Sequence, residues 1–157
     1  LVGAFFLLLN SRGSINISRM VSESVGDTKK LAQKLARSKK RIFALVGELG
    51  SGKTTFVQAF LRAQGVRSRI TSPTFVIIKR FKIYDLRFKN AYHIDCYRLK
   101  NSKELLKLGL KEILANKHNI VLIEWADKIK SLLPKRGVQW IYFEHSRIAK
   151  ERRIIIK

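Results

Sequence analysis

The fold of this chain is decided by Gly47-Glu48-Leu49-Gly50-Ser51-Gly52-Lys53-Thr54, which fills the pattern G-x-x-x-x-G-K-[ST]. An apolar run, residues 42–46, precedes this stretch, and an amphipathic stretch, residues 55–64, follows it. Strand, glycine-rich loop and helix in this order are typical of a phosphate-binding loop, where backbone N–H groups and the positive end of the helix surround nucleotide phosphates. Lys53 would reach the β and γ phosphates, and the Thr54 hydroxyl would bind a Mg²⁺ ion. The alternative is a glycine turn without a ligand.

The order of apolar and amphipathic segments predicts an α/β protein. Strands are expected at 41–46, 75–78, 91–95, 120–123, 138–143 and 152–156, with a hairpin over 79–90. Helices are expected from Asp27 onward, at 55–64, at 101–115 with a break at Gly109, and at 127–133. Strands alternate with helices early and follow one another late. We therefore expect a single domain, residues 20–157, with a P-loop NTPase-like three-layer fold and a mixed central sheet.

Residues 1–19 differ from the rest of the chain. Their apolar run, residues 4–9, is too short to span a bilayer, and no basic residue precedes it as in a signal peptide. Met20 is the single methionine and stands just before the first organised segment. We expect this N-terminal extension to be disordered, or to lie upstream of the true start codon at Met20. A short membrane-targeting segment is the alternative.

The balance of charge is strongly basic. The 157 residues include 33 Lys and Arg against 11 Asp and Glu, a formal net charge of +22. Such a charge favours a polyanionic partner, namely RNA, DNA or an acidic protein face, because Lys and Arg release counterions from phosphate backbones. The competing explanation is a solvated surface in a chain rich in Lys and Ile. The basic blocks at 29–41 and 79–103 lack the regular aromatic interleaving of a platform that stacks single strands.

Cysteine and histidine offer no metal site. Cys96 is the single cysteine, so an intramolecular disulfide or a Cys-rich zinc site is impossible, which suits a reducing cytosol. We expect Cys96 to serve packing. The three histidines, His93, His118 and His145, lack the spacing of metal ligands, and we expect them to be structural or exposed rather than catalytic.

Two acidic residues stand out because each ends an apolar stretch. Glu124 follows residues 120–123, and Asp95 ends the alternating stretch 92–95. Hydrolysis of a nucleoside triphosphate needs a carboxylate near the metal, and a Mg²⁺ ion would supply the counter-charge that a partly buried carboxylate requires. Both residues are therefore candidates for the metal site. Alternatively, one of them caps a neighbouring helix or pairs with Arg98.

Two residues with hydroxyl groups flank Pro73. Ser72 and Thr74 are placed where a loop between core elements would meet the γ phosphate and sense its presence. An ordinary Ser-Pro turn is the alternative. Trp125, next to Glu124, is either part of the core or an aromatic lid on the site.

Four motifs in order resemble the TsaE (YjeE) family. They are GELGSGKTTF at 47–56, TSPTF at 71–75, HIDCYRL at 93–99 and LIEW at 122–125. The resemblance runs from Val21 to Lys157, and residues 104–110 are similar to the family's E-L-x-x-L-G-L helix. That family supplies the P-loop ATPase of the bacterial machinery that installs threonylcarbamoyl on adenosine 37 of tRNA.

The resemblance implies roles for individual residues. The phosphates of ATP or ADP would be held by Gly50, Ser51, Gly52, Lys53, Thr54 and Thr55, and Mg²⁺ by Thr54 and Glu124. Catalysis would involve Lys53, Asp95, which would position the attacking water or the metal shell, and Thr74 in a switch-like loop. Thr28 and Arg152 would contact the nucleoside, with Arg153 as the alternative to Arg152.

By the same resemblance, the chain would bind TsaD-like and TsaB-like proteins in the cytoplasm, where slow ATP hydrolysis would reset that complex between turnovers. It would meet tRNA indirectly or through a basic surface, with no membrane involved. The extension at 1–19 and the basic segment at 79–89 depart from the family pattern. Two alternatives are a small P-loop metabolite kinase and a nucleotide-dependent RNA-binding protein.

Overall fold

The computed structural model of this chain describes residues 8–9, 15–16, 20–22, 24–73, 77–84, 87–145 and 152–157, with only the backbone of residues 8, 9, 15, 16, 20, 21 and 152. The helices are α1 (Val25–Ala36), α2 (Lys53–Ala63), α3 (Lys103–Lys107), α4 (Leu110–Ala115) and the 3-10 helix η1 (Ala126–Leu132). The strands are β1 (Leu8–Leu9), β2 (Ile15–Asn16), β3 (Met20–Ser22), β4 (Ile42–Gly47), β5 (Ile78–Lys82), β6 (Asn90–Asp95), β7 (Asn119–Glu124), β8 (Val138–His145) and β9 (Arg152–Ile156).

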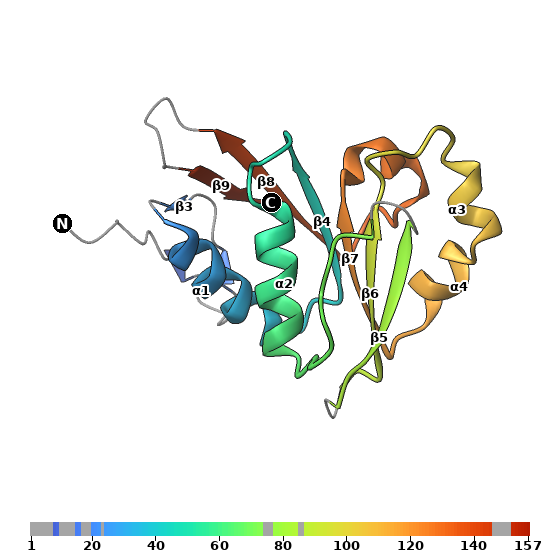
Figure 1. The fold of residues 1–157 in the computed structure, drawn as a ribbon, viewed down its shortest axis with the longest axis horizontal. Helices are drawn as coiled ribbons and strands as arrows, with labels where there is room; N and C mark the ends of the chain where they lie inside the picture. Colours follow the sequence, from blue (N-terminus) through green and yellow to red (C-terminus); the bar gives the residue numbers. More distant parts are fainter. Residues whose placement is uncertain are drawn as a thin grey trace.

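The described strands from β3 onward form one seven-stranded sheet in the order β3-β9-β8-β4-β7-β6-β5. Strands β8, β4, β7 and β6 run parallel to one another. Strand β5 is antiparallel to β6, and β9 is antiparallel to both β8 and β3. The sheet is therefore mixed, with β4, the strand before the glycine loop, at its centre. Figure 1 shows α1 and α2 on one side of this sheet and α3 and α4 on the other.

Each face of the sheet has its own core, because successive side chains of a strand point to opposite faces. Phe43 and Leu45 of β4 pack in one core with residues of α1 and α2. Ile42 and Ala44 of the same strand pack in the second core with residues of α3, α4 and η1. Cys96 is fully buried in this second core, in keeping with the packing role expected from the sequence.

Helices α1 and α2 lie against each other and end close together. Ser24 caps α1, since its Oγ accepts a hydrogen bond from the backbone N–H of Asp27 at 3.2 Å. Gln64 follows α2, and its buried Nε2 donates to the carbonyl oxygen of Ala36 at 2.6 Å. This bond joins the carboxyl ends of the two helices and fixes the orientation of α2, the helix that follows the glycine loop.

The predicted three-layer α/β fold with a mixed sheet is confirmed, with shifts at the ends of elements. Helix α2 begins at Lys53 rather than Thr55, and the strand expected from residue 75 begins at Ile78, residues 74–76 being outside the described part. The predicted hairpin over 79–90 is instead formed by β5 with β6, and β6 begins at Asn90, one residue before the predicted strand. The predicted break at Gly109 separates α3 from α4.

Little of residues 1–19 is described. Leu8–Leu9 and Ile15–Asn16 form an antiparallel pair, and the first strand of the main sheet begins at Met20. The expectation of a disordered extension stays a prediction. Within the described residues, none of the helices combines the length and the apolar character needed to cross a membrane.

The packing of α2 against the sheet gives a first prediction. Phe60 is fully buried, and its ring meets Phe43 of β4 edge-on with 4.7 Å between centroids. Phe60→Ala should lower the free energy of unfolding by about 3–5 kcal/mol, because a cavity replaces a close-packed ring. Urea unfolding followed by circular dichroism measures this loss. Leu108→Ala, at a side chain 51% exposed, is the control and should change stability by about 0.5 kcal/mol or less.

Candidate functional site

The loop between β4 and α2 has a backbone that glycine permits. Gly50 and Gly52 have φ values of 75° and 104°, which side chains disfavour, and Gly52 is the N-cap of α2. At Gly47, with φ of 154°, an added Cβ would collide with the carbonyl oxygen of Phe143 in β8. The first turn of α2 contains no acidic residue, and no side chain caps the helix. The positive end of α2 is therefore available to an anion.

Lys53 lies beneath this loop and is 4% exposed. Its Nζ donates to the carbonyl oxygens of Gly47 at 2.7 Å and Glu48 at 2.8 Å. The ammonium group also lies 4.2 Å from the ring centroid of Trp125. Burial lowers the pKa of Lys53, and the nearby carboxylates, Glu124 first, act in the opposite direction.

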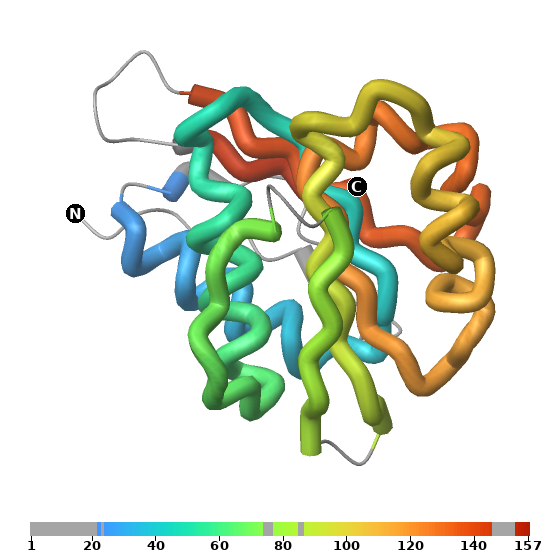
Figure 2. Tube along the Cα trace, turned by 45° about the vertical axis from the view of Figure 1, so that its right-hand side comes forward, coloured from blue at the N-terminus to red at the C-terminus, as the bar shows by residue number. Residues whose placement is uncertain are grey.

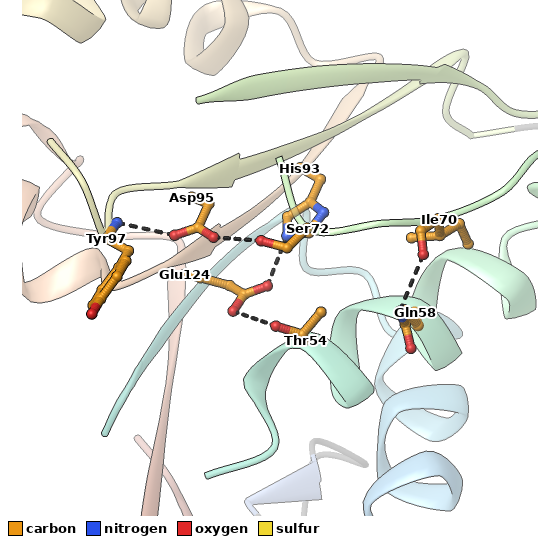
Figure 3. Close-up of polar contacts among 8 residues, drawn as sticks. All are labelled: Thr54, Gln58, Ile70, Ser72, His93, Asp95, Tyr97 and Glu124. Atoms are coloured by element: carbon orange, nitrogen blue, oxygen red, sulfur yellow. Dashed lines mark hydrogen bonds and ion pairs between the residues drawn. The ribbon is translucent and has the colours of Figure 1, made fainter. Parts of the chain in front are cut away.

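Glu124 is a buried carboxylate held from two sides. The Thr54 hydroxyl donates to its Oε2 at 2.9 Å, and His93 Nε2 lies 2.8 Å from its Oε1 (Figure 3). An ionised carboxylate only accepts hydrogen bonds, so this contact requires the proton of the imidazole on Nε2. His93 is fully buried, and its Nδ1 has no hydrogen-bond partner within the described residues. Two donors from different elements thus fix the orientation of the Glu124 carboxylate.

Asp95 lies beside Glu124 at the same edge of the sheet. The Ser72 hydroxyl donates to its Oδ2 at 2.6 Å, and the backbone N–H of Tyr97 donates to its Oδ1 at 3.0 Å (Figure 3). The segment that carries Ser72 is tied to α2 as well, because Gln58 Nε2 donates to the carbonyl oxygen of Ile70 at 3.1 Å. These bonds hold the loop before residue 74 against the carboxylate.

The sheet itself explains why these groups meet. Strands β6 and β7 are parallel, and Asp95 is the direct neighbour of Glu124 in their register. His93 and Leu122 stand two positions earlier in these strands and point to the same face as Asp95 and Glu124. This is the face covered by α2. His93 therefore points toward Glu124, and Glu124 points toward Thr54 at the start of α2. Strand β4 ends at the same edge and delivers the glycine loop.

A cleft of about 310 Å³ opens at this edge. Its lining residues come from the glycine loop, the start of α2, the segment before residue 74, and the ends of β6 and β7: Leu49, Gly50, Gly52, Lys53, Thr54, Thr55, Ser72, Asp95, Tyr97, Glu124 and Trp125. Its size is in the range of small-molecule sites. Trp125 is half-buried in the wall, with its ring 5.1 Å from that of Tyr97, so it is neither wholly core nor a free lid.

The cleft fits a nucleotide with its metal ion. The glycine backbone, the uncapped end of α2 and Lys53 provide hydrogen-bond donors and positive charge for phosphates. The oxygens of Thr54, Glu124 and Asp95 are ligands of the kind that Mg²⁺ prefers. Among the described residues, no three His, Cys, Asp or Glu side chains gather to hold a metal by themselves. Phosphate oxygens would complete the coordination, as is usual for Mg²⁺.

Most of the residues predicted to form the site line the cleft, namely Gly50, Gly52, Lys53, Thr54, Thr55, Asp95 and Glu124. Ser51 is buried, with Oγ 3.4 Å from Lys53 Nζ. Thr28 is fully buried in α1, its Oγ1 3.1 Å from Ser22 Oγ, and it does not line the cleft. Its contact with a nucleoside stays a prediction that requires Thr28 to become accessible. Arg153 is exposed in β9, whereas Thr74 and the Arg152 side chain lie outside the described residues.

Two residues of the site were not identified from the sequence. His93 was expected to be structural or exposed, and Tyr97 was not considered. The signal for His93 was present, because it stands two residues before Asp95 in one strand and so shares its face. Without the register of β6 against β7, however, nothing in the sequence indicated that this face meets Glu124.

The sequence of this chain is similar to those of known proteins. A family model described as "Threonylcarbamoyl adenosine biosynthesis protein TsaE" matches residues 22–155. The tRNA threonylcarbamoyladenosine biosynthesis protein TsaE of Rickettsia felis is 42% identical over 110 residues, which are 68% of this chain and 61% of that protein. The protein of the same name from Haemophilus influenzae is 34% identical over 105 residues, covering 67% of this chain and 64% of its own length.

A solved structure has the same fold. The crystal structure of Bacillus subtilis YdiB matches with a TM-score of 0.69 at 29% sequence identity, covering 88% of this chain and 82% of that one. The chain spans about three fifths of the length of the Rickettsia felis relative. Because the family model covers most of the sequence, from β3 to β9, this chain belongs to the TsaE family.

Proposed function

We propose that this protein binds ATP with Mg²⁺ in the cleft and hydrolyses it to ADP and phosphate. The observation that supports this most directly is the bond between Thr54, the last residue of the phosphate-loop pattern, and the buried carboxylate of Glu124. A hydroxyl at the start of α2 and a carboxylate at the tip of a neighbouring strand are the pair that holds Mg²⁺ in P-loop hydrolases. The oxygens of this pair lie 2.9 Å apart.

The chain's own groups divide the work of hydrolysis. Lys53 would exchange its bonds to the Gly47 and Glu48 carbonyls for phosphate oxygens and stabilise their charge. Thr54 and Glu124 would hold the Mg²⁺ ion, which neutralises phosphate charge when bound. Asp95, fixed by Ser72 and the Tyr97 N–H, would orient the attacking water or a water of the metal shell. Thr74 would sense the γ phosphate from the loop that Ser72 anchors.

The named relatives support a role in tRNA modification. Proteins of Rickettsia felis and Bacillus subtilis that resemble this chain are named for tRNA threonylcarbamoyladenosine biosynthesis. We infer that this chain acts in the same process in the cytoplasm, and that ATP hydrolysis resets a complex of TsaD-like and TsaB-like proteins. A metabolite kinase is less well supported, because Lys53 is the single cation among the described residues that line the cleft.

Substitutions in the cleft test the hydrolysis proposal. Lys53→Ala or Thr54→Ala should lower ATP hydrolysis by about 100-fold or more, since each removes a group that stabilises the transferring phosphoryl charge. Glu124→Ala should weaken Mg²⁺-dependent ATP binding. Phosphate release and titration calorimetry measure the two effects. Glu112→Ala, at an exposed carboxylate of α4, is the control. Wild-type turnover in the Lys53 and Thr54 variants would remove this assignment of the site.

His93 gives a test of how Glu124 is positioned. His93→Leu leaves a buried carboxylate with one donor fewer, so the free energy of unfolding should fall by about 2 kcal/mol. Mg²⁺-dependent nucleotide affinity should fall as well, because the carboxylate is free to turn away from Thr54. His93→Gln keeps an N–H donor and should recover part of both losses. The matched control is His118→Leu, at an exposed histidine. Unchanged stability and affinity in His93→Leu would show that the contact does not hold Glu124.

The role in tRNA modification requires binding to the transferase complex. The chain, immobilised, should retain the corresponding TsaD and TsaB proteins, and the amount retained should differ between ATP, ADP and no nucleotide. Lys53→Ala should lose this dependence on nucleotide, because the cleft no longer holds the phosphates. If neither protein is retained under any of the three conditions, the modification role loses its main support, whereas the hydrolysis proposal stands on its own assay.

A further inference from the structure

Half of the acidic residues that the structure describes lie at one end of the parallel strands. Eight of the eleven acidic residues lie in the described part: Asp27, Glu48, Asp95, Glu104, Glu112, Glu124, Asp127 and Glu144. Four of them, Glu48, Asp95, Glu124 and Asp127, lie in the glycine loop, at the carboxyl ends of β6 and β7, and in η1 just after β7. The opposite edge, where the parallel strands begin, has a different composition.

Four connecting segments meet at that opposite edge. One segment follows α1 (residues 37–41), and a second follows α2 (64–67). A third lies at the end of the β5–β6 hairpin turn (87–89), and a fourth joins α4 to β7 (116–118). Both views place them together at the lower end of the molecule, away from the glycine loop (Figures 1 and 2). None of these four segments contains an acidic residue. Asp85, in the same hairpin, lies outside the described residues.

Hydrogen bonds join these segments into one surface. The guanidinium of Arg87 donates to the carbonyl oxygen of Ser38 at 3.0 Å and so ties the hairpin to the end of α1. Arg41 donates to the carbonyl oxygen of Leu114 at 2.6 Å and ties the start of β4 to the end of α4. The N–H of Lys89 donates to the carbonyl oxygen of His118 at 2.9 Å. With the bond from Gln64 to Ala36, every segment is linked to a neighbour.

Eight exposed cations stand on this surface, which we call the basic pole: Arg37, Lys39, Lys40, Arg62, Arg67, Arg87, Lys89 and Lys117. Arg62, in the last turn of α2, belongs to it because its guanidinium donates to the carbonyl oxygen of Val66 at 2.7 Å, beside Arg67. Their like charges repel one another, because none of the four segments contains an acidic residue that would offset them. Such an arrangement favours a ligand that brings several negative charges at once.

We propose that the basic pole binds the phosphodiester backbone of RNA. A backbone needs only spaced cations, whose binding releases its condensed counterions. A protein partner would require apolar anchors at the centre of the interface, where Lys is depleted. Of the large apolar side chains exposed in the described part, only Tyr84 belongs to the β5–β6 hairpin that ends at the pole, and it is 92% exposed. A single exposed aromatic ring beside cations is suited to stacking on an unpaired base.

The pole and the cleft lie at opposite ends of the parallel strands, so RNA and ATP have separate sites. The choice of RNA over other polyanions rests on the proposed function in tRNA modification. The surface itself rests on the charge and contacts of the four segments. RNA binding at the pole should therefore persist when ATP and Mg²⁺ fill the cleft.

The test uses the full chain and an unmodified tRNA transcript, with fluorescence anisotropy across a series of salt concentrations. The pole variant replaces Lys39, Lys40, Lys89 and Lys117 by Gln. It should bind the transcript about tenfold or more weakly, and the slope of log affinity against log salt should fall by about 3–4, since each lysine contact contributes about 1. The control variant replaces Lys29, Lys30, Lys103 and Lys107, exposed lysines of α1 and α3, by Gln and should bind as the wild type does.

The same measurements contain the results that would overturn the proposal. They are equal losses in the pole and control variants, an unchanged affinity in the pole variant, and tighter wild-type binding to polyglutamate or duplex DNA than to the transcript. Displacement of the transcript by ATP with Mg²⁺ would place RNA in the cleft instead. A double variant, Lys89→Gln with Lys117→Gln, tests the pole without altering the link between α1 and β4. Calorimetry with ATP on each variant reports on the cleft separately, so loss of RNA binding and loss of nucleotide binding are distinguished.

Discussion

The site depends on a negative charge that is held at the tip of a buried strand. Glu124 is 2% exposed, and an isolated carboxylate at that depth would cost several kcal/mol. Thr54 and His93 lower this cost by bonding one oxygen each. They come from α2 and β6, so the orientation of one side chain depends on the helix after the glycine loop and on the neighbouring strand. A shift of either element would leave one of the two carboxylate oxygens without its donor.

The same arrangement explains the state of Lys53. Its ammonium is buried beneath the glycine loop, where two backbone carbonyls accept its hydrogen bonds and the carboxylates of Glu124 and Asp95 lie near enough to oppose the lowering of its pKa. The loop therefore carries its cation already in place, at the position where phosphate oxygens would replace the carbonyls. Little rearrangement of the backbone would be required on binding, because the glycine conformations and the N-terminus of α2 are already formed.

Local signals in the sequence were sufficient to predict the fold and those site residues that stand at the ends of strands. The glycine pattern after an apolar run predicted the loop, and the apolar stretches before Asp95 and Glu124 indicated that both carboxylates were candidates for the metal site. His93 could not be assigned in this way, because its role comes from the register of β6 against β7, which pairs it with Leu122 and aims it at Glu124. The start of α2 was missed by two residues because Gly52, with φ of 104°, serves as its N-cap without a capping side chain.

The distribution of charge along the strands matches the ligand that we propose for each end. A cleft for phosphates and Mg²⁺ needs both signs at close range, and it has a lysine, a helix N-terminus and two carboxylates whose charges partly cancel. The +22 net charge therefore has to be carried outside the cleft. Part of this charge lies on the basic pole, whose four segments are held together by hydrogen bonds through Arg41, Gln64 and Arg87. Those three side chains bond to carbonyl oxygens at helix ends and in loops, so the surface is fixed in shape while the lysines around it stay exposed to a ligand.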